Sequence, residues 1–173
     1  MKKGKIMQEP RLGKGVIIGK NVKFGKDVVI WNYVVVGDNA KIDDGSCIGS
    51  FCDIGKDVVI GKNCNIQAHV TISNGCRIGN EVFIAPNSSI LNDKFPLSEP
   101  ITPPIIEDKT VIGGSAVILP NTTVGRKSVV AAGSVVTENV KPNTVVKGSP
   151  AKPMMTRKKY EARKKAFIEK QKR

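Results

Sequence analysis

An aliphatic or phenylalanine side chain recurs at every sixth position over most of the chain. The series runs unbroken from Leu12 to Ile90, resumes in a new phase at Ile112 and ends at Val136, which makes nineteen hexapeptides. A period of six fits neither the α-helix nor simple alternation, but it fits a short strand and a tight turn repeated around a three-sided coil. Because three hexapeptides form one coil, the series predicts about six coils.

Two other positions of the hexapeptide complete the pattern. Glycine often follows the aliphatic residue directly, as expected where the backbone bends and a side chain would obstruct it. Four residues after the aliphatic residue comes a small or β-branched one, from Val16 onward. Both the aliphatic and the small position are predicted to face inward, so that stacked coils bury one continuous core.

Three of the four cysteines occupy the small inward position. Cys52, Cys64 and Cys76 are spaced twelve residues apart, and we interpret them as core thiols, because free cysteine is commonly buried. Cys47 is off this register and is assigned no chemistry. The chain has no C-x-x-C pair and a single histidine, His69, so the sequence argues against structural zinc and no metal is expected.

This pattern resembles the hexapeptide-repeat acyltransferases, in which an aliphatic residue, a small or acidic one, two variable ones and another small one recur every six residues. The resemblance covers about residues 11–153, after a lead-in over residues 1–10. It implies an all-β fold, a left-handed parallel β-helix. The handedness rests on the resemblance alone, because left-handed crossovers are otherwise rare.

The repeat is interrupted once, between Ile90 and Ile112. These residues are 22 apart, which is not a multiple of six, and four prolines lie between them. Proline cannot donate to a strand ladder, so we expect an excursion loop over about residues 91–109. A loop kept inside a regular solenoid is more often functional than accidental.

The end of the chain is expected to be a basic α-helix over residues 154–173, which contain neither glycine nor proline. Met155, Tyr160 and Lys164, with Phe167 and Ile168, are predicted to form an edge that covers the open end of the last coil.

The net charge of +13 is concentrated in that same tail. Residues 154–173 hold nine Lys or Arg against two Glu, so the other 153 residues carry only +6. The tail has few aromatic residues and no recognised binding motif, which argues against nucleic acid as a partner. No long apolar run and no apolar signal core is present, so we expect no membrane segment and a cytoplasmic protein.

His69 is the candidate general base. It lies in the stretch 65–72, which looks like the I-Q-x-H/N-x-x-I segment of hexapeptide acetyltransferases that act on nucleotide-linked amino sugars. An imidazole at a polar corner can take a proton from an attacking amine or hydroxyl. The alternative is a surface histidine without a role.

The acceptor side continues one coil further on, where residues 82–87 and 90–96 are similar to the family's V-F-I-x-x-x and N-D-x-Y/F-P stretches. Asn87 follows His69 by eighteen residues, so both are expected on one corner, in a polar strip beside the loop that begins near Asn92. Asn92 and Asp93 are candidates to bind the acceptor or orient its nucleophile, or else they form a turn. Maltose and galactoside acetyltransferases carry a histidine before a proline in this loop, and Phe95 in that place argues against that branch.

The donor side is predicted at a corner lined by small residues. The stretches 112–116 and 130–134 are eighteen residues apart and place Gly114, Ser115, Ala132 and Gly133 on successive coils. A slender pantetheine arm fits along such a groove and bonds to backbone groups that bulky side chains would block, although plain turn formation also explains the small residues.

In the family, acetyl-CoA follows this corner toward a terminal G-N/S-P-A-K/R motif, present here as residues 148–152 with Pro150 at its centre. The resemblance implies that Lys147 and Lys152 meet the CoA phosphates, with Arg126 or Lys127 as further contributors.

These residues predict a homotrimer that transfers an acetyl group from acetyl-CoA to the amino group of a nucleotide-linked sugar. The alternatives are a sugar O-acetyltransferase and a non-catalytic β-helix scaffold, which would need neither the loop nor the terminal motif. A γ-class carbonic anhydrase shares the fold but needs three histidines, and the chain has one.

Overall fold

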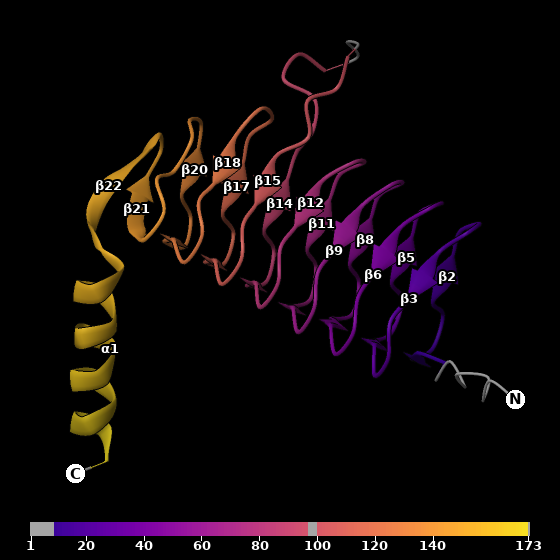
Figure 1. The fold of residues 1–173 in the computed structure, drawn as a ribbon, viewed down its shortest axis with the longest axis horizontal. Helices are drawn as coiled ribbons and strands as arrows, with labels where there is room; N and C mark the ends of the chain where they lie inside the picture. Colours follow the sequence, from indigo (N-terminus) through magenta and orange to yellow (C-terminus); the bar gives the residue numbers. More distant parts are fainter. Residues whose placement is uncertain (1–8, 97–99, 173) are drawn as a thin grey trace, which may run out of the picture.

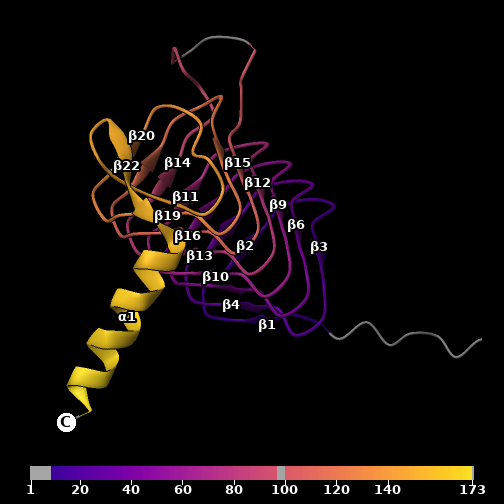
Figure 2. The same cartoon turned by 60° about the vertical axis from the view of Figure 1, so that its left-hand side comes forward.

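The computed structural model describes residues 9–96 and 100–172, which form a parallel solenoid followed by one helix (Figure 1). Successive strands of the solenoid lie on three different sheets, and each strand up to residue 148 pairs in parallel with the strand one coil away. Asn65 pairs with Phe83 and Thr71 with Ser89, a register of eighteen residues. This architecture confirms the left-handed parallel β-helix of hexapeptide repeats (Figure 2).

We name the sheets A, B and C in the order in which a coil visits them. Sheet A contains β1 (Arg11–Leu12), β4 (Val29–Ile30), β7 (Cys47–Ile48), β10 (Asn65–Ile66), β13 (Phe83–Ile84), β16 (Val111–Ile112), β19 (Val129–Val130), β21 (Thr144–Gly148) and β22 (Ala151–Thr156). Sheet B contains β2 (Ile17–Ile18), β5 (Val35–Val36), β8 (Asp53–Ile54), β11 (Thr71–Ile72), β14 (Ser89–Ile90), β17 (Val117–Ile118) and β20 (Val135–Val136). Sheet C contains β3 (Lys23–Phe24), β6 (Lys41–Ile42), β9 (Val59–Ile60), β12 (Arg77–Ile78), β15 (Ile105–Ile106) and β18 (Thr123–Val124).

The core is one column of inward side chains along the solenoid axis. The predicted aliphatic positions from Ile30 to Val136 are buried, as are Cys52, Cys64 and Cys76 on the small position. The first coil is different, because it has a neighbour on one side only. Leu12 is accordingly half exposed.

Where a glycine follows the aliphatic residue at a corner, the next coil comes close to it. A Cβ on Gly49 would lie 2.5 Å from the backbone nitrogen of Ala68, and one on Gly113 would lie 2.4 Å from that of Ala132. The left-handed backbone conformation falls elsewhere, on the residue two positions after the glycine. The prediction that a side chain in place of these glycines would obstruct the backbone is therefore confirmed by how closely the next coil approaches them.

The excursion loop is shorter than the sequence predicted. Strand β15 lies inside the expected range 91–109, with Ile106 fully buried, so the coil resumes one hexapeptide before Ile112. The proline pair just before β15 obscured this unit, although its spacing from Ile112 is six. The repeat also continues past Val136, with β21 on sheet A, so the described part of the chain holds 21 parallel strands (β1–β21) and about seven coils instead of six. The amide of Thr102 donates to the carbonyl of Asn92 (2.8 Å) and closes the base of the loop.

The C-terminal element differs from the expected helix over residues 154–173. Helix α1 spans Arg157–Gln171 and begins after Thr156, whose side chain accepts a hydrogen bond from the amide of Lys159 (3.3 Å). Met154 and Met155 belong to β22, which runs antiparallel to β21 and directs the chain away from the last coil. The predicted cap is therefore wrong: α1 buries none of its described residues, and Phe167 is 64% exposed. The helix projects from the solenoid (Figure 1).

Candidate functional site

One corner of the solenoid, where sheet A turns into sheet B, carries most of the predicted site; we call it the A–B corner. His69, Asn87, Ser115 and Gly133 occupy the same left-handed position on four successive coils, with φ of 59°, 61°, 56° and 66°. Their amides each donate to the coil before, for example Asn87 to Ala68 (3.2 Å). The predicted stacking of His69 and Asn87 on one corner is thereby confirmed, and the donor residues lie on the same line.

His69 is exposed to solvent and stands on an aromatic stack that the sequence reading missed. The ring of Phe51 lies parallel to the imidazole, with centroids 4.9 Å apart and an interplanar angle of 8°. Tyr33 stacks on Phe51 in turn, at 5.3 Å and 16°. The signal was present in the sequence, because Tyr33, Phe51 and His69 are spaced by eighteen residues.

Asn92 and Asp93 lie on a different corner, where sheet B turns into sheet C (the B–C corner). The loop leaves the coil there, opposite sheet A (Figure 2). The side-chain amide of Asn92 donates to the carbonyl of Asn74 (3.0 Å), and Asp93 accepts a hydrogen bond from the amide of Phe95 (3.0 Å). Within one chain the expected polar strip beside the loop is therefore not formed. The loop starts at the next corner of the solenoid, and sheet B separates that corner from His69.

The small residues on the A–B corner leave backbone groups accessible. On the B–C corner, the amides of Lys20 and Lys56 donate to the side chains of Asp38 and Asn74 one coil further on (2.8 Å each). The residue in that relation to Gly114 is Ala132, whose side chain carries no acceptor. Ala132 therefore cannot accept a hydrogen bond from the Gly114 amide as Asp38 and Asn74 do from the amides of Lys20 and Lys56.

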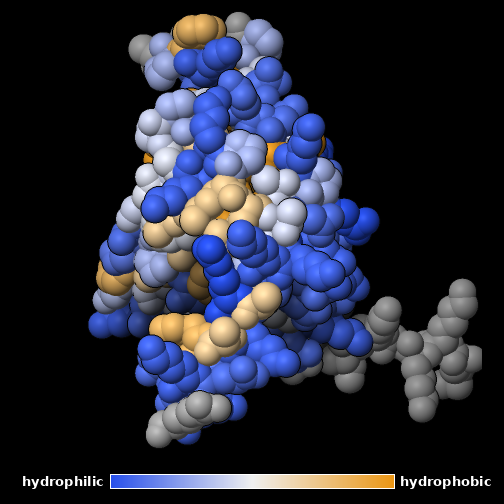
Figure 3. All heavy atoms as spheres, turned by 90° about the vertical axis from the view of Figure 1, so that its left-hand side faces the viewer, coloured by the Kyte–Doolittle hydropathy of each residue, from blue (hydrophilic) through white to orange (hydrophobic). Residues whose placement is uncertain are grey.

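A cleft of about 570 Å³ adjoins this corner at the C-terminal end of the solenoid (Figure 3). It lies between the outer face of sheet A and the segment formed by β22 and α1. Its walls are mostly apolar, with two basic side chains; the lining residues are Val111, Gly113, Val129, Val130, Ala131, Ala132, Val145, Lys147, Met154, Met155, Tyr160 and Arg163. The cleft shares Gly113, Ala131 and Ala132 with the A–B corner and so extends the predicted donor groove.

The terminal motif forms the hairpin that borders this cleft. Lys147 on β21 is directly opposite Lys152 on β22, and Pro150 lies in the turn between the strands. Lys147 lines the cleft, whereas the ammonium group of Lys152 is 3.7 Å from the carboxylate of Glu138. The two lysines are neighbours on the hairpin, but of the two only Lys147 lines the cleft.

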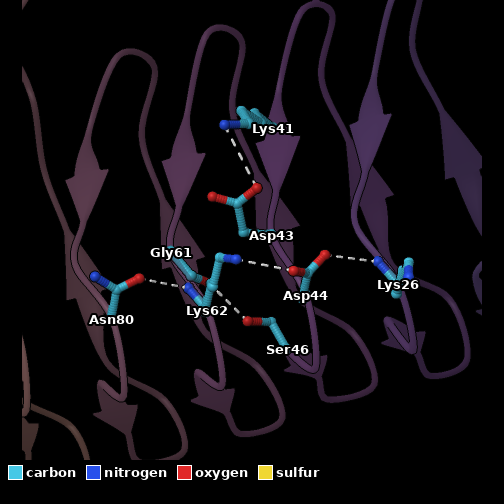
Figure 4. Close-up of polar contacts among 8 residues, drawn as sticks. All are labelled: Lys26, Lys41, Asp43, Asp44, Ser46, Gly61, Lys62 and Asn80. Atoms are coloured by element: carbon cyan, nitrogen blue, oxygen red, sulfur yellow. Dashed lines mark hydrogen bonds and ion pairs between the residues drawn. The ribbon is translucent and has the colours of Figure 1, made fainter.

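The third corner, where sheet C turns into sheet A, carries a ladder of polar contacts between coils (Figure 4). Asp44 accepts hydrogen bonds from the amide of Lys26 (2.9 Å) and the ammonium group of Lys62 (2.9 Å), and these contacts lower the pKa of its carboxyl. Arg126 and Lys127 lie on this corner too. They are separated from the donor groove by sheet A, so their expected contribution to phosphate binding is not supported.

The buried thiols give a prediction on reactivity. Burial raises the pKa of Cys52 to about 11 and that of Cys76 to about 12, so both stay protonated and unreactive at neutral pH. We expect a thiol reagent at pH 8 to label only the half-buried Cys47 in the native protein and all four cysteines in denaturant. Cys47→Ser is the control and should abolish the native reaction. Rapid labelling of more than one thiol would contradict the buried positions.

Residues 9–96 and 100–172 contain no group of three or more His, Cys, Asp or Glu that would hold a metal ion. No helix within those residues has the length and apolar character needed to cross a bilayer.

Comparison with known proteins assigns the class. The model of the bacterial transferase hexapeptide (six repeats) matches residues 21–56, 39–74, 57–92 and 103–138. The chain therefore belongs to the bacterial transferase hexapeptide family.

Curated relatives match shorter stretches. The chain is 59% identical over 51 residues to the 2,3,4,5-tetrahydropyridine-2,6-dicarboxylate N-acetyltransferase of Clostridium perfringens, covering 30% of this chain and 22% of that protein. It is 43% identical over 67 residues to the enzyme of that name from Staphylococcus aureus, covering 39% and 28%. The matches thus span less than a third of the length of these relatives.

Solved structures match over most of the chain. The hexapeptide-repeat acetyltransferase VCA0836 of Vibrio cholerae is 27% identical, with a TM-score of 0.53 over 81% of this chain and 73% of that one. The UDP-N-acetylglucosamine acyltransferase of Francisella novicida has a TM-score of 0.61 at 19% identity, over 90% of this chain and 69% of that one. The second likeness is one of fold alone.

Proposed function

We propose that this protein is an acetyl-CoA-dependent acetyltransferase whose acceptor is the amino group of a nucleotide-linked sugar. The observation that carries the proposal is that one corner combines an exposed imidazole, His69, with a groove of small residues two coils away. Coils are spaced by about 4.8 Å, so the imidazole lies roughly 10 Å along the axis from Ser115. A thioester at the end of a pantetheine arm spans that distance.

The chemistry needs one base and no covalent enzyme intermediate. The acceptor nitrogen attacks the thioester carbonyl carbon, and a tetrahedral intermediate forms. His69 takes the proton that the nitrogen loses, and it returns this proton to the sulfur as the carbon–sulfur bond breaks. The products are the N-acetylated acceptor and free CoA thiol.

The donor is held by backbone and by charge. The pantetheine amides bond to exposed backbone groups beside Gly114, Ser115, Ala132 and Gly133, and the adenosine end enters the cleft of about 570 Å³. Lys147 and Lys152 supply positive charge for the phosphates, with Pro150 shaping the turn between them.

An amine acceptor is supported by the relatives, which are named N-acetyltransferases. Asn87 is exposed one coil from His69 and offers an amide to the acceptor. Asn92 and Asp93 stand on another corner, so they reach the acceptor only from a neighbouring copy. The site we propose is therefore shared, with His69 from one subunit and the loop from the next.

A shared site predicts a homotrimer, in which three prisms pack around a threefold axis and form three equivalent clefts. We expect the mass in solution to be three times that of the 18.6 kDa chain at micromolar concentration. Light scattering after gel filtration measures it. A monomer would remove the shared acceptor site.

The direct test is CoA release from acetyl-CoA against a panel of amino and neutral nucleotide sugars, with succinyl-CoA as a second donor. Turnover with an amino sugar alone supports the proposal. Turnover with neutral sugars alone indicates O-acetylation instead, and no acyl-CoA binding by calorimetry indicates a scaffold.

A further inference from the structure

Three aromatic residues occupy a backbone conformation that disfavours them. Tyr33, Phe51 and His69 have φ of 56°, 61° and 59°, in the left-handed region. Glycine tolerates this region and asparagine, aspartate and histidine are enriched in it, whereas a tyrosine or phenylalanine there is an outlier. The left-handed conformation itself recurs on all three corners, as at Asn39, Asn63 and Lys127, so the unusual feature of this column is its rings and not its backbone.

The aromatic residues are confined to one line on the surface. At the left-handed positions of the other two corners nearby stand Asn39, Asp57 and Asn63. One coil before Tyr33 the position holds Gly15, and a Cβ there would lie 2.6 Å from the Tyr33 ring. Among the described residues with positive φ, rings therefore occur on three consecutive coils only, and the last is His69.

The stack covers ring faces and leaves ring edges exposed. Tyr33 packs on one face of Phe51 and His69 on the other, at 5.3 Å and 4.9 Å, while Tyr33 remains 47% and Phe51 52% exposed. Because both faces of Phe51 are taken, it offers no free face on which a ligand stacks. The near-parallel angle of 8° instead fixes the plane of the imidazole and leaves the edge with its two nitrogens outside the stack.

We infer that Phe51 is a positioning residue for His69. The ring of Phe51 fixes the plane of the imidazole across the corner. A nitrogen of His69 is therefore already oriented toward the acceptor amine and does not first have to change rotamer. A base whose rotamer is locked by packing keeps the geometry that proton transfer needs. This inference rests on the proposed role of His69 as general base.

The test compares Phe51→Asn, Phe51→Tyr and Tyr33→Asn. Asparagine fits the left-handed backbone and removes the ring, tyrosine keeps the ring, and Tyr33→Asn removes a ring that does not contact His69. We expect Phe51→Asn to lower kcat by roughly one to two orders of magnitude with the KM for acetyl-CoA unchanged. Phe51→Tyr should keep kcat within about threefold of the wild-type value. Tyr33→Asn should lower kcat less than Phe51→Asn does.

A readout independent of activity comes from NMR, because His69 is the only histidine in the chain. The ring current of Phe51 should shift the imidazole protons upfield in the wild type, and Phe51→Asn should move them toward the values of a free histidine. Unshifted wild-type signals would overturn the stack, and a shift that Phe51→Asn removes without loss of kcat would overturn the positioning role. A wild type without transferase activity would overturn the proposed function, and this role with it, even where NMR shows the stack.

Discussion

Replacing His69 by alanine is expected to lower kcat about 10²- to 10⁴-fold, the usual contribution of a general base. The affinity for acetyl-CoA should hardly change, because the donor groove begins two coils further on. Stability should also be preserved, since His69 is exposed and its removal opens no cavity in the core. Steady-state kinetics with saturating donor and calorimetry with acetyl-CoA measure the two effects separately.

Asn63→Ala is the matched control for this variant. Asn63 has the same left-handed backbone (φ 54°) and is also exposed, but it lies on the corner between sheets C and A. It should leave kcat unchanged. A loss of less than about fivefold in His69→Ala would remove His69 as the base.

A tryptophan at Gly114 or Ala132 is expected to weaken acetyl-CoA binding by at least about 100-fold, or ~2.7 kcal/mol. The added side chain projects into the groove where the pantetheine arm is proposed to lie. The fold should tolerate the change, because a Cβ on Gly114 meets the nearest atom, the carbonyl oxygen of Pro86, at an ordinary 3.4 Å. Ala132 is exposed on the next coil.

Lys56→Trp provides the control, since Lys56 is the exposed second residue of the B–C corner and touches no part of the donor groove. Calorimetry with acetyl-CoA and thermal unfolding of all three variants separate a blocked groove from a damaged fold. Donor affinity that is unchanged in both corner variants would place the groove on another corner.

Two segments show where sequence reasoning stopped short. Strand β15 falls in the proline-rich stretch, so its six-residue spacing from Ile106 to Ile112 stands among residues that are typical of a loop. The segment from Met154 to Thr156 has helical composition but pairs with β21, because the strand ladder offers its backbone hydrogen-bond partners before the helix begins. In both cases pairing with a neighbouring strand outweighed the local pattern.

The sequence predicts some parts of the candidate site but not others. Residues eighteen apart, such as His69 and Asn87, are placed on one corner by the period alone, and so are Gly114 and Ala132. Asn92 follows His69 by 23 residues, close to four hexapeptides, so the same period already places it one corner beyond the column of His69 and Asn87. The cleft beside Lys147 required the structure, because the path of β22 and α1 forms one wall.

The sequence by itself determined the solenoid, its inward residues and the columns of stacked corners, because a period of six satisfies sterics, burial and backbone pairing in every coil at once. Only the tertiary structure decided which columns meet, how the rings of Tyr33, Phe51 and His69 stack, and where α1 projects. These features depend on distances between side chains of different coils and on a single departure from the repeat. A periodic pattern carries no information on either.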